Sequence, residues 1–477
     1  MFFGRTNEIQ AFDRLWALPG ASLAVCRGRR RVGKSSLVEE FARRSKVRFF
    51  KLEGIAPGEN VDNKTQLEAF ARQINEQCGI SAETPQNWFD AFALLDKALP
   101  KRARAVVLLD EISWMGKYDP SFSGELKYAW DNRFSKHERK IFVLCGSVSA
   151  WIARNILRSK AFVGRISLNL VLRDLPIRDC LGFWGVKASL VDTREIVDVL
   201  SVVGGIPEYL RLVNPSESAD ENIRRLCFSP TGILLDEFDA IFDDVVEENL
   251  VTRRKMLEAL AGSSLTGREI AERIGLDYNG HVSDNLFALE EAGFIAKDSG
   301  INPDNGKVSN SCRYRICDNY TRFYLKYIQR ERELIRNGTF RFSSLEQLPG
   351  WDAVMGLQFE CLMIANLADL LPLMGLDSSL LVSAAPYLRR ETDGRKGVQI
   401  DLLLQTRRAM YVVEIKRKNE IGEGVVEEVA AKVGALRKRK GMSVRAVLVY
   451  EGRLSRRVPA DGYFSHLISV DEFLRGR

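Results

Sequence analysis

The sequence predicts an α/β protein of several domains, and three observations support this fold class. An apolar run of strand type, 21–26, leads into the stretch GRRRVGKS and then into a helical pattern. The chain has 477 residues, and a prior of about 150 residues per domain gives about three domains. Two later segments have different patterns. Residues 251–320 show helices followed by a hairpin, and the segment from 351 shows paired apolar strands that carry acidic residues.

The stretch from Gly28 to Ser35 fits the phosphate-binding pattern G-x-x-x-x-G-K-[ST] at every specified position. Such a loop points backbone N–H groups at a phosphate chain, and the helix after it adds the partial positive charge of its N-terminus. We expect Lys34 to reach the β- and γ-phosphates of ATP and the Ser35 hydroxyl to bind Mg²⁺. The alternative is a chance Gly-Lys turn. The predicted nucleotide-binding residues of this loop are Gly28, Arg29, Arg30, Arg31, Val32, Gly33, Lys34, Ser35 and Ser36.

Composition excludes several classes of protein. A hydrophobic fraction of 45% and a charged fraction of 28% are ordinary for globular proteins. No apolar run approaches the roughly 18 residues of a membrane span, and the first residues lack the pattern of a signal peptide, so we expect a cytoplasmic protein without a membrane partner. Eight scattered cysteines and three histidines indicate neither a disulfide framework nor a zinc cluster.

The net charge of +7 is unevenly distributed along the chain. Residues 389–477 contain 20 Lys and Arg against 12 Asp and Glu, an excess of +8, which leaves the rest of the chain at −1. Such an excess favours a polyanionic partner, and we expect nucleic acid, DNA rather than RNA. A solvated basic face is the alternative.

The apolar run 105–110 predicts a buried strand that ends in Asp110 and Glu111. Ligands of open α/β sheets bind at the carboxyl ends of the strands. We therefore expect Asp110 to hold the Mg²⁺ shell and Glu111 to polarise the water that attacks the γ-phosphate. A strand that ends in a solvated acidic turn is the alternative.

Two further polar residues lie at the ends of predicted strands. Ser147 follows the strand 140–145, where a polar side chain would lie beside the γ-phosphate and report its presence. Arg165 precedes the strand-like run 166–172 and could neutralise charge on the phosphates, in cis or from a neighbouring subunit of a homo-oligomer. A serine turn after a strand needs no function, so this alternative stays open.

These motifs together resemble the archaeal-type ATPases, a P-loop group close to AAA+ and STAND NTPases. The resemblance is carried by the Gly28–Lys34 string, by 109–112, by 146–147 and 164–165, and by Gly-Gly-Ile-Pro-Glu-Tyr-Leu at 204–210. It implies that the opening Gly4-Arg5 lies near the adenine and that Pro207 belongs to a helical lid near the nucleotide. From spacing alone, Gly204 and Gly205 are only a helix end before a turn that begins with proline.

Residues 251–320 predict a winged helix-turn-helix. Helices are expected at 253–260, from the capping box Thr266-Gly-Arg-Glu269 to Gly275, and at 280–292, followed by strands at 293–297 and 312–317. In a DNA-binding version the helix 280–292 enters the major groove, but it is poor in cations. A packing module that relays the nucleotide state is equally consistent. The aromatic and basic segment that follows suggests a linker helix.

The last segment, from residue 351, centres on two paired strands, 398–404 and 411–416, which bring Asp401, Glu414 and Lys416 to one end of a hairpin. This arrangement resembles the core of PD-(D/E)xK restriction-endonuclease-like nucleases, with Ile400 in place of the usual proline, and Glu360 matches an additional acidic residue of that fold. The resemblance implies a divalent cation at Asp401, Glu414 and Glu360, with Lys416 beside the attacking water. The alternative is an exposed hairpin with a surface ion pair.

The predicted domains are a P-loop ATPase core (1–175), a helical lid (176–250), a winged helix (251–320), a helical linker (321–350) and an α/β restriction-endonuclease-like domain (351–477). The first functional hypothesis is an ATP-hydrolysing protein that acts on nucleic acid, in which the nucleotide state controls a metal-dependent nuclease-like domain. The second is a STAND-type signalling or defence switch, whose last domain only binds DNA or a partner.

Overall fold

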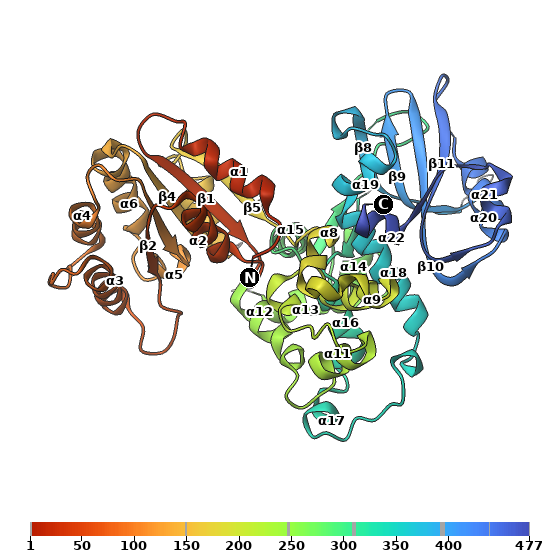
Figure 1. Ribbon diagram of the computed structural model, residues 1–477, viewed down its shortest axis with the longest axis horizontal. Helices are drawn as coiled ribbons and strands as arrows, with labels where there is room; N and C mark the ends of the chain where they lie inside the picture. Colours follow the sequence, from red (N-terminus) through yellow and green to blue (C-terminus); the bar gives the residue numbers. More distant parts are fainter. Residues whose placement is uncertain are drawn as a thin grey trace. The chain divides into compact units, whose positions relative to one another are not determined.

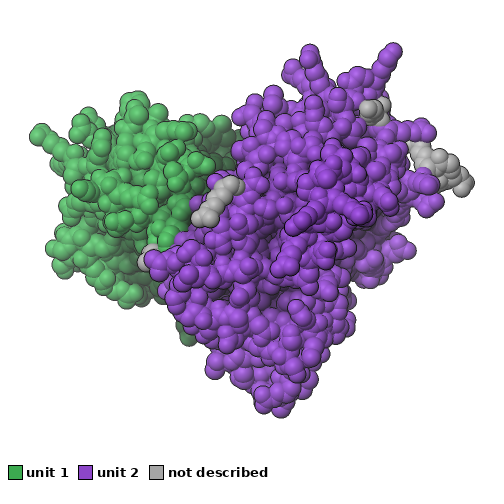
Figure 2. Space-filling view, turned by 45° about the vertical axis from the view of Figure 1, so that its right-hand side comes forward, with its two compact units in different colours: residues 1–175 green, residues 176–477 purple. Residues whose placement is uncertain are grey.

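The computed structural model describes residues 2–147, 150–245, 249–307, 312–391, 396–437 and 439–476. The chain forms two compact units, Met1–Leu175 and Pro176–Arg477, which are coloured separately in Figure 2. The first unit contains a parallel five-stranded sheet, and the second contains a mixed five-stranded sheet and a two-stranded hairpin. The α/β fold class is therefore confirmed.

The sheet of the first unit is parallel throughout, and two of its three inner strands, β3 and β4, are buried on both faces. β3 and β4 have no exposed residue, which explains why their sequences are nearly continuous apolar runs. β1 lies between β4 and β5, so the phosphate-binding loop leaves the sheet beside the carboxyl ends of both neighbours. The strands follow one another across the sheet as β2 (Arg48–Glu53), β3 (Ala105–Asp110), β4 (Lys140–Gly146), β1 (Ser22–Gly28) and β5 (Ile166–Leu172).

Helices cover this sheet (Figure 1). One group packs through an aromatic core in which Trp88, Phe92 and Phe122 contact one another. The helix after the phosphate-binding loop, α2, packs against β1, β3 and β4 and stacks Phe41 on Phe12 of α1. The helices of this unit are α1 (Thr6–Leu15), α2 (Lys34–Ser45), α3 (Asn63–Cys78), α4 (Trp88–Ala98), α5 (Ile112–Met115), α6 (Phe122–Asn132) and α7 (Ala150–Ile152), with a π-helical turn, η2 (Ala153–Leu157), and a 3₁₀ turn, η1 (Phe134–Lys136).

The second unit begins with helices. The longest of them, α9, is amphipathic and ends at Gly204, whose φ of 64° lies in the region that favours glycine. Pro207 then opens α10 at its first position, where its missing N–H costs no hydrogen bond. These helices are α8 (Ile177–Cys180), α9 (Thr193–Val203), α10 (Pro207–Leu210), α11 (Ala219–Cys227) and α12 (Glu237–Val245), with 3₁₀ turns η3 (Leu181–Ser189) and η4 (Ile233–Leu235).

A helical triplet and a hairpin follow, in the order expected for a winged helix. They are α13 (Leu250–Leu260), α14 (Gly267–Arg273), α15 (Gly280–Glu291), β6 (Ile295–Asp298) and β7 (Arg313–Ile316). The Thr266 side chain accepts from the Glu269 N–H, and the Glu269 carboxylate accepts from the Thr266 N–H, so the expected capping box is formed. Leu265 pairs with Tyr314 and adds a third strand contact to the hairpin.

The segment 321–350, predicted as a helical linker, packs in part into the core of the second unit. It is helical in part, as α16 (Asn319–Phe323), the π-turn η5 (Tyr324–Ile328) and α17 (Arg332–Arg336), and within 319–328 every residue except Lys326 is buried. Tyr320 donates its hydroxyl to the Leu234 carbonyl at 2.6 Å, and Tyr324 stacks on Phe238. The aromatic residues therefore pack in the core of the second unit.

The C-terminal sheet is mixed. β8 pairs antiparallel with β9 and β9 with β10, whereas β10, β11 and β12 run parallel. Its elements are α18 (Trp351–Ala365), α19 (Leu367–Leu373), η7 (Ser378–Leu380), β8 (Leu381–Arg389), β9 (Val398–Thr406), β10 (Ala409–Ile421), α20 (Gly424–Ala435), β11 (Ser443–Leu454), α21 (Arg457–Asp461), β12 (Phe464–Ser469) and α22 (Val470–Arg475), after the 3₁₀ turn η6 (Leu345–Gln347).

No single helix within the described residues has the length and apolar composition to cross a membrane. The pair α18 and α19, bent by 77°, passes the same criteria together. α18 packs against α9, α16 and β10, so it is a core helix of the second unit.

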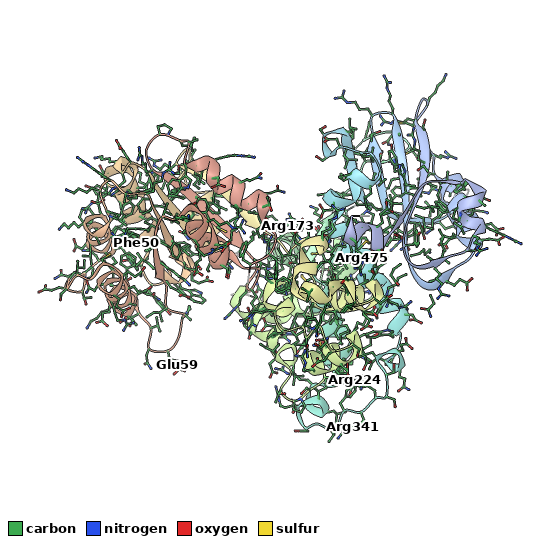
Figure 3. The ribbon with its side chains drawn as sticks, in the orientation of Figure 1. Phe50, Glu59, Arg173, Arg224, Arg341 and Arg475 are labelled. Atoms are coloured by element: carbon green, nitrogen blue, oxygen red, sulfur yellow. The ribbon has the colours of Figure 1, made fainter. Side chains whose placement is uncertain are left out.

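Hydrogen bonds join the first helices of the second unit to helices of its C-terminal segment. Arg178 on α8 donates to the Phe473 carbonyl at 2.9 Å, and Arg475, labelled in Figure 3, donates to the carbonyls of Ala188 and Val191. The Ile177 N–H donates to the Asn366 side chain. The segment expected as a lid and the segment expected as a nuclease-like domain thus share one compact unit.

Candidate functional site

The end of β3 meets the start of α2 in the first unit. The Ser35 hydroxyl donates to Asp110 Oδ2 at 2.6 Å, although the two residues are 75 positions apart in the sequence. Asp110 is buried, and Lys51 of the neighbouring strand β2 places its Nζ 3.5 Å from the same oxygen. A hydroxyl and a carboxylate of the expected Mg²⁺ site therefore lie side by side at the carboxyl edge of the sheet.

The loop between β1 and α2 is shaped by two residues with positive φ, Arg31 at 69° and Gly33 at 88°. Successive N–H groups in such a turn form a concave anion-binding surface. Gly28 is required for a different reason, because a Cβ atom on it would lie 2.4 Å from the Leu172 carbonyl of β5. Lys34 is 6% exposed and donates to the Arg29 carbonyl at 3.2 Å, so its ammonium group lies over the loop.

Arg5 supports this loop. Its guanidinium is 5% exposed and donates to the Val32 carbonyl at 3.1 Å and to the carbonyl of Arg173 at 2.6 Å. Arg173 is labelled in Figure 3. The resemblance implied a place near the adenine for Gly4 and Arg5; the geometry shows that Arg5 ties the loop to the segment after β5.

Glu111 follows Asp110 with a φ of 49°, which is uncommon for a residue with a side chain. A Cβ atom on Gly146 would lie 3.9 Å from Glu111 Oε2, so the Glu111 carboxylate lies beside the end of β4. Ser147 comes directly after that strand end and is 5% exposed. The two residues predicted to act on and to sense the γ-phosphate thus share one edge of the sheet.

Arg165 directly precedes β5 and so lies at the amino edge of the sheet, opposite the edge that carries the loop, where it pairs with Asp131. Its Nε donates to Asp131 Oδ1 at 2.6 Å and its Nη2 to Asp131 Oδ2 at 2.9 Å. Hydrogen bonds from Arg165, opposed by partial burial, lower the pKa of Asp131 to about 2. A role for Arg165 toward phosphate in cis does not fit this position, so only the role from a neighbouring subunit stays a prediction. Pro207 lies in the second unit, so its place relative to the loop stays a prediction.

Mg²⁺ fits the donors at the loop. It prefers hard oxygen ligands, keeps several waters and is usually bound through one or two protein oxygens together with substrate phosphates. The Ser35 hydroxyl and the Asp110 carboxylate are such a pair.

The three C-terminal residues Asp401, Glu414 and Lys416 are brought together, as the strand pairing predicts. Asp401 Oδ2 accepts from the Ile415 N–H at 2.8 Å, next to Glu414 on β10. Burial, and then the charge of Asp401, raise the pKa of Glu414. The Lys416 Nζ lies 2.7 Å from Glu414 Oε1 and 2.8 Å from Glu428 Oε1. The hairpin is buried at this point, which excludes a surface ion pair.

A second lysine, which the sequence did not single out, completes this cluster. Lys432 on α20 donates to both oxygens of Glu414, at 2.7 and 2.6 Å. Glu414 is fully buried, so two ammonium groups compensate one buried carboxylate. In the sequence, Lys432 is marked only by its place eight residues after the start of the helix that follows β10. Exposed lysines are common at such positions, so this place did not indicate a buried partner.

Glu360 on α18 faces the same cluster. Burial, and then the charge of Asp401, raise its pKa to about 7. Within the described residues, however, no three His, Cys, Asp or Glu side chains are close enough together to hold a metal ion. The predicted ligands Asp401, Glu414 and Glu360 therefore do not form a ready metal site, because lysine ammonium groups occupy the oxygens of Glu414.

Comparisons with known proteins agree with the geometry of the first unit. Residues 2–213 match the model of a family described as an ATPase domain predominantly from Archaea. An uncharacterised protein of Methanocaldococcus jannaschii is 24% identical over 363 residues, which cover 76% of each chain.

Among solved structures, the Walker-type ATPase of Pyrococcus abyssi matches 68% of this chain and 96% of its own, with 15% identity and a TM-score of 0.51. The ORC2 protein of Aeropyrum pernix matches 70% of this chain and 94% of its own, with 13% identity and a TM-score of 0.42. The family match stops before the winged helix and the C-terminal sheet. Residues 2–213 are therefore similar to the ATPase domain of that family.

Proposed function

We propose that this protein hydrolyses ATP at the Gly28–Ser35 loop and uses the nucleotide state to control the action of its second unit on nucleic acid. The observation that carries the first part is the 2.6 Å hydrogen bond between Ser35 and Asp110. This bond joins the predicted phosphate-binding loop to the strand end that carries the predicted Mg²⁺ ligand. The two parts of a nucleotide site therefore lie next to each other in the structure.

Each residue around the loop has a separate role in the proposed reaction. The loop N–H groups and Lys34 bind and orient the phosphates. Mg²⁺, held through Ser35 and Asp110, would neutralise charge on the β- and γ-phosphates. Glu111 is placed beside Gly146, where it can orient a water and accept its proton. Ser147 lies at the same edge and would donate to the γ-phosphate.

The second unit offers a route from nucleotide state to the C-terminal sheet. The predicted lid, 176–250, is joined to helix α22 by the hydrogen bonds of Arg178 and Arg475 and to strand β10 by the pair of Asp198 with Arg417. If the lid follows the nucleotide, the sheet should move with it, because breaking the largely buried pair of Asp198 and Arg417 costs free energy.

For the C-terminal cluster we propose metal-dependent cleavage of nucleic acid as the finer assignment, with Asp401 and Glu414 as metal ligands, Glu360 as an additional acid and Lys416 beside the reacting phosphate. The two carboxylates and Lys416 on one hairpin support it. Lys432 would have to release Glu414 first. No step of the ATPase chemistry depends on this assignment.

A second candidate is the STAND-type switch, in which the last domain binds DNA or a partner without turnover. The observation that favours it is the double compensation of Glu414 by Lys416 and Lys432, which is a complete buried ion network without a metal. The cation-poor helix α15 also agrees with a module that packs instead of reading DNA.

Release of phosphate from ATP tests the proposal. The Glu111→Gln variant should bind ATP as the wild type does and lose most of its turnover, because the base is gone and the loop is intact. Glu68→Gln, on the exposed face of α3, is the matched control and should keep full turnover. Wild-type protein that releases no phosphate with Mg²⁺ present, or undiminished turnover in Glu111→Gln, contradicts the assignment.

A further inference from the structure

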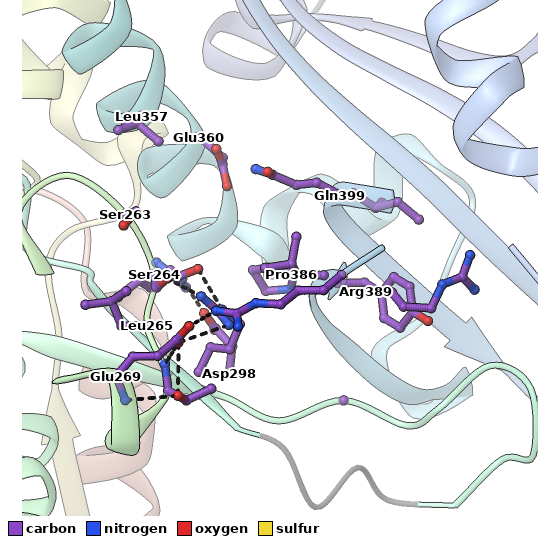
Figure 4. Close-up of a pocket in the computed structure, with 18 of the residues that line it drawn as sticks. Ser263, Ser264, Leu265, Glu269, Asp298, Leu357, Glu360, Pro386, Arg389 and Gln399 are labelled. Atoms are coloured by element: carbon purple, nitrogen blue, oxygen red, sulfur yellow. Dashed lines mark hydrogen bonds and ion pairs between the residues drawn. The ribbon is translucent and has the colours of Figure 1, made fainter. Parts of the chain in front are cut away.

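A cavity of about 1080 Å³ lies between the winged helix and the C-terminal sheet, within the second unit. Figure 4 shows Glu360 and Gln399 on one side of it and Ser264, Leu265 and Glu269 on the other. The cavity thus brings together the start of α14, the wing after β6, helix α18 and strands β8 and β9. Its volume is at the upper end of the range of small-ligand pockets.

The lining is strongly basic. Seven arginines line the cavity against four acidic residues, of which Glu360 has a pKa raised by burial to about 7. In the described part of the chain, no carboxylate pairs with Arg268, which is exposed on α14, or with Arg322, which is 4% exposed. Arg322 donates instead to Gln358 and to the carbonyls of Ile316 and Leu357. A basic concave surface of this kind fits an anionic ligand.

Two further arginines meet at one carboxylate across the cavity. Glu269, which caps α14, lies 3.4 Å from Arg313 of β7 and also pairs with Arg390 at the end of β8. Since guanidinium groups bind carboxylates and phosphates in the same bidentate way, a phosphodiester could replace Glu269 between these two arginines. The Arg390 side chain is 69% exposed, so the exchange needs no buried group to move.

The cavity leads to the C-terminal cluster. Glu360 lines it, and the charge of Asp401 acts on Glu360 directly. Ile400, one residue before Asp401 on β9, lines it as well. An extended chain of phosphates in the cavity would therefore pass beside the carboxylates to which cleavage is assigned.

We propose that this cavity binds a single-stranded segment of nucleic acid, with phosphates on Arg268, Arg313 and Arg390, and leads the strand toward Asp401 and Glu414. A concave site of about 1080 Å³ admits a strand with unpaired bases more readily than a double helix, and Tyr387 in its lining offers a ring on which a base can stack. The inference rests on the proposed action on nucleic acid and adds the form of the substrate. In this proposal the winged helix contacts the nucleic acid through α14 and not through α15.

Fluorescence anisotropy on the full-length protein tests this inference, with a labelled oligothymidylate of about 20 nucleotides, the matching oligouridylate and a blunt duplex, in EDTA so that no strand is cut. The variant Arg268→Ser/Arg390→Ser removes two cavity charges, and Arg407→Ser/Arg408→Ser removes two exposed charges from the hairpin between β9 and β10 as the matched control.

We expect tighter binding of the single strands than of the duplex, and a loss of about tenfold or more in affinity for the cavity variant only. The dependence of log affinity on log salt should also become shallower by about 1.4, since each phosphate contact on a single strand contributes about 0.7. The difference in affinity between the oligothymidylate and the oligouridylate shows whether the site distinguishes DNA from RNA.

Equal losses in the two double variants, or a preference for duplex, overturn the cavity as the binding site. The proposed function fails separately. Wild-type protein that binds single strands through the cavity but cuts none of them with Mn²⁺ and ATP leaves the cavity assigned and removes the nuclease assignment. Wild-type protein that hydrolyses ATP and binds no strand overturns the inference and leaves the ATPase assignment standing.

Discussion

The carboxylate of Asp198 on α9 pairs with the guanidinium of Arg417 on β10, one residue after Lys416. Asp198 is largely buried, and burial, opposed by the charge of Arg417, raises its pKa. Glu451 on β11 lies 3.8 Å from both Arg417 and Arg194, which extends the pair to the next strand. The helix assigned to the lid thus contacts the strand that carries Glu414 and Lys416.

Breaking this pair should destabilise the second unit. Asp198→Ala leaves Arg417 buried with a weaker partner, which costs about 3 kcal/mol, whereas Asp198→Leu/Arg417→Met should recover most of the loss. Urea unfolding measures both. Arg211→Ala, which breaks the exposed pair with Glu208, is the control and should cost less than about 0.5 kcal/mol. A loss of that small size in Asp198→Ala would show that the pair does not hold the lid to the sheet.

Arg5 should matter for ATP binding without contacting the phosphates. Arg5→Ala removes the donors to the Val32 and Arg173 carbonyls and leaves both acceptors without them, so the loop loses its support. We expect ATP affinity to fall about tenfold and thermal stability to fall as well. Arg14→Ala, at the exposed end of α1, should change neither. Unchanged affinity in Arg5→Ala would mean that the loop holds its shape unaided.

Glu360 predicts a pH dependence of stability. Its pKa in the folded protein, about 7, lies above its ordinary value of 4.5. Stability from this group is therefore complete below about pH 4.5 and is lost as pH rises to about 7, because the unfolded chain releases the proton first. Relative to Glu360→Gln, the wild type should lose about 2 kcal/mol between pH 5 and pH 8. Denaturant unfolding in EDTA measures it, and parallel pH profiles of the two proteins would disprove the raised pKa.

Lys432 predicts how the C-terminal cluster responds to metal. Lys432→Met removes one of two ammonium groups from the buried Glu414, so the melting temperature in EDTA should fall. If Asp401 and Glu414 are metal ligands, millimolar Mn²⁺ should restore it, since the cation takes the place of the lysine. Lys418 is exposed on β10, the strand of Glu414, and Lys418→Met is the control. Its melting temperature should neither fall in EDTA nor rise with Mn²⁺. A loss that Mn²⁺ does not restore favours the switch and leaves the cluster as an ion network.

The sequence predicted the backbone of the candidate site better than its charge partners. The meeting of Ser35 with Asp110 follows from a loop after one strand and a carboxylate at the end of another, because parallel strands share an edge. Lys432 and Asp131 could not be found in this way. They act through contacts between elements far apart in the chain, and a lysine or aspartate on a helix face has no periodic signature.

Segment 319–328 shows the same limit in the fold. Its aromatic and basic residues have helical spacing, which suggests a linker helix but does not show where the helix packs. Arg322 is buried all the same, because backbone carbonyls and Gln358 accept its hydrogens without any carboxylate. Burial of a guanidinium in this way depends on where other chain segments end, and a single segment's pattern does not contain that information.

Calorimetric titration of ATP with Mg²⁺ tests the central claim most directly. Lys34→Ala should weaken binding by about a hundredfold or more, because Lys34 is the side chain that the loop pattern assigns to the β- and γ-phosphates. Lys46→Ala, just beyond the end of α2, is the matched control and should bind ATP as the wild type does. Wild-type binding that depends on Mg²⁺ and is lost in Lys34→Ala is the predicted result, and unchanged ATP affinity in Lys34→Ala would contradict the assignment of the site.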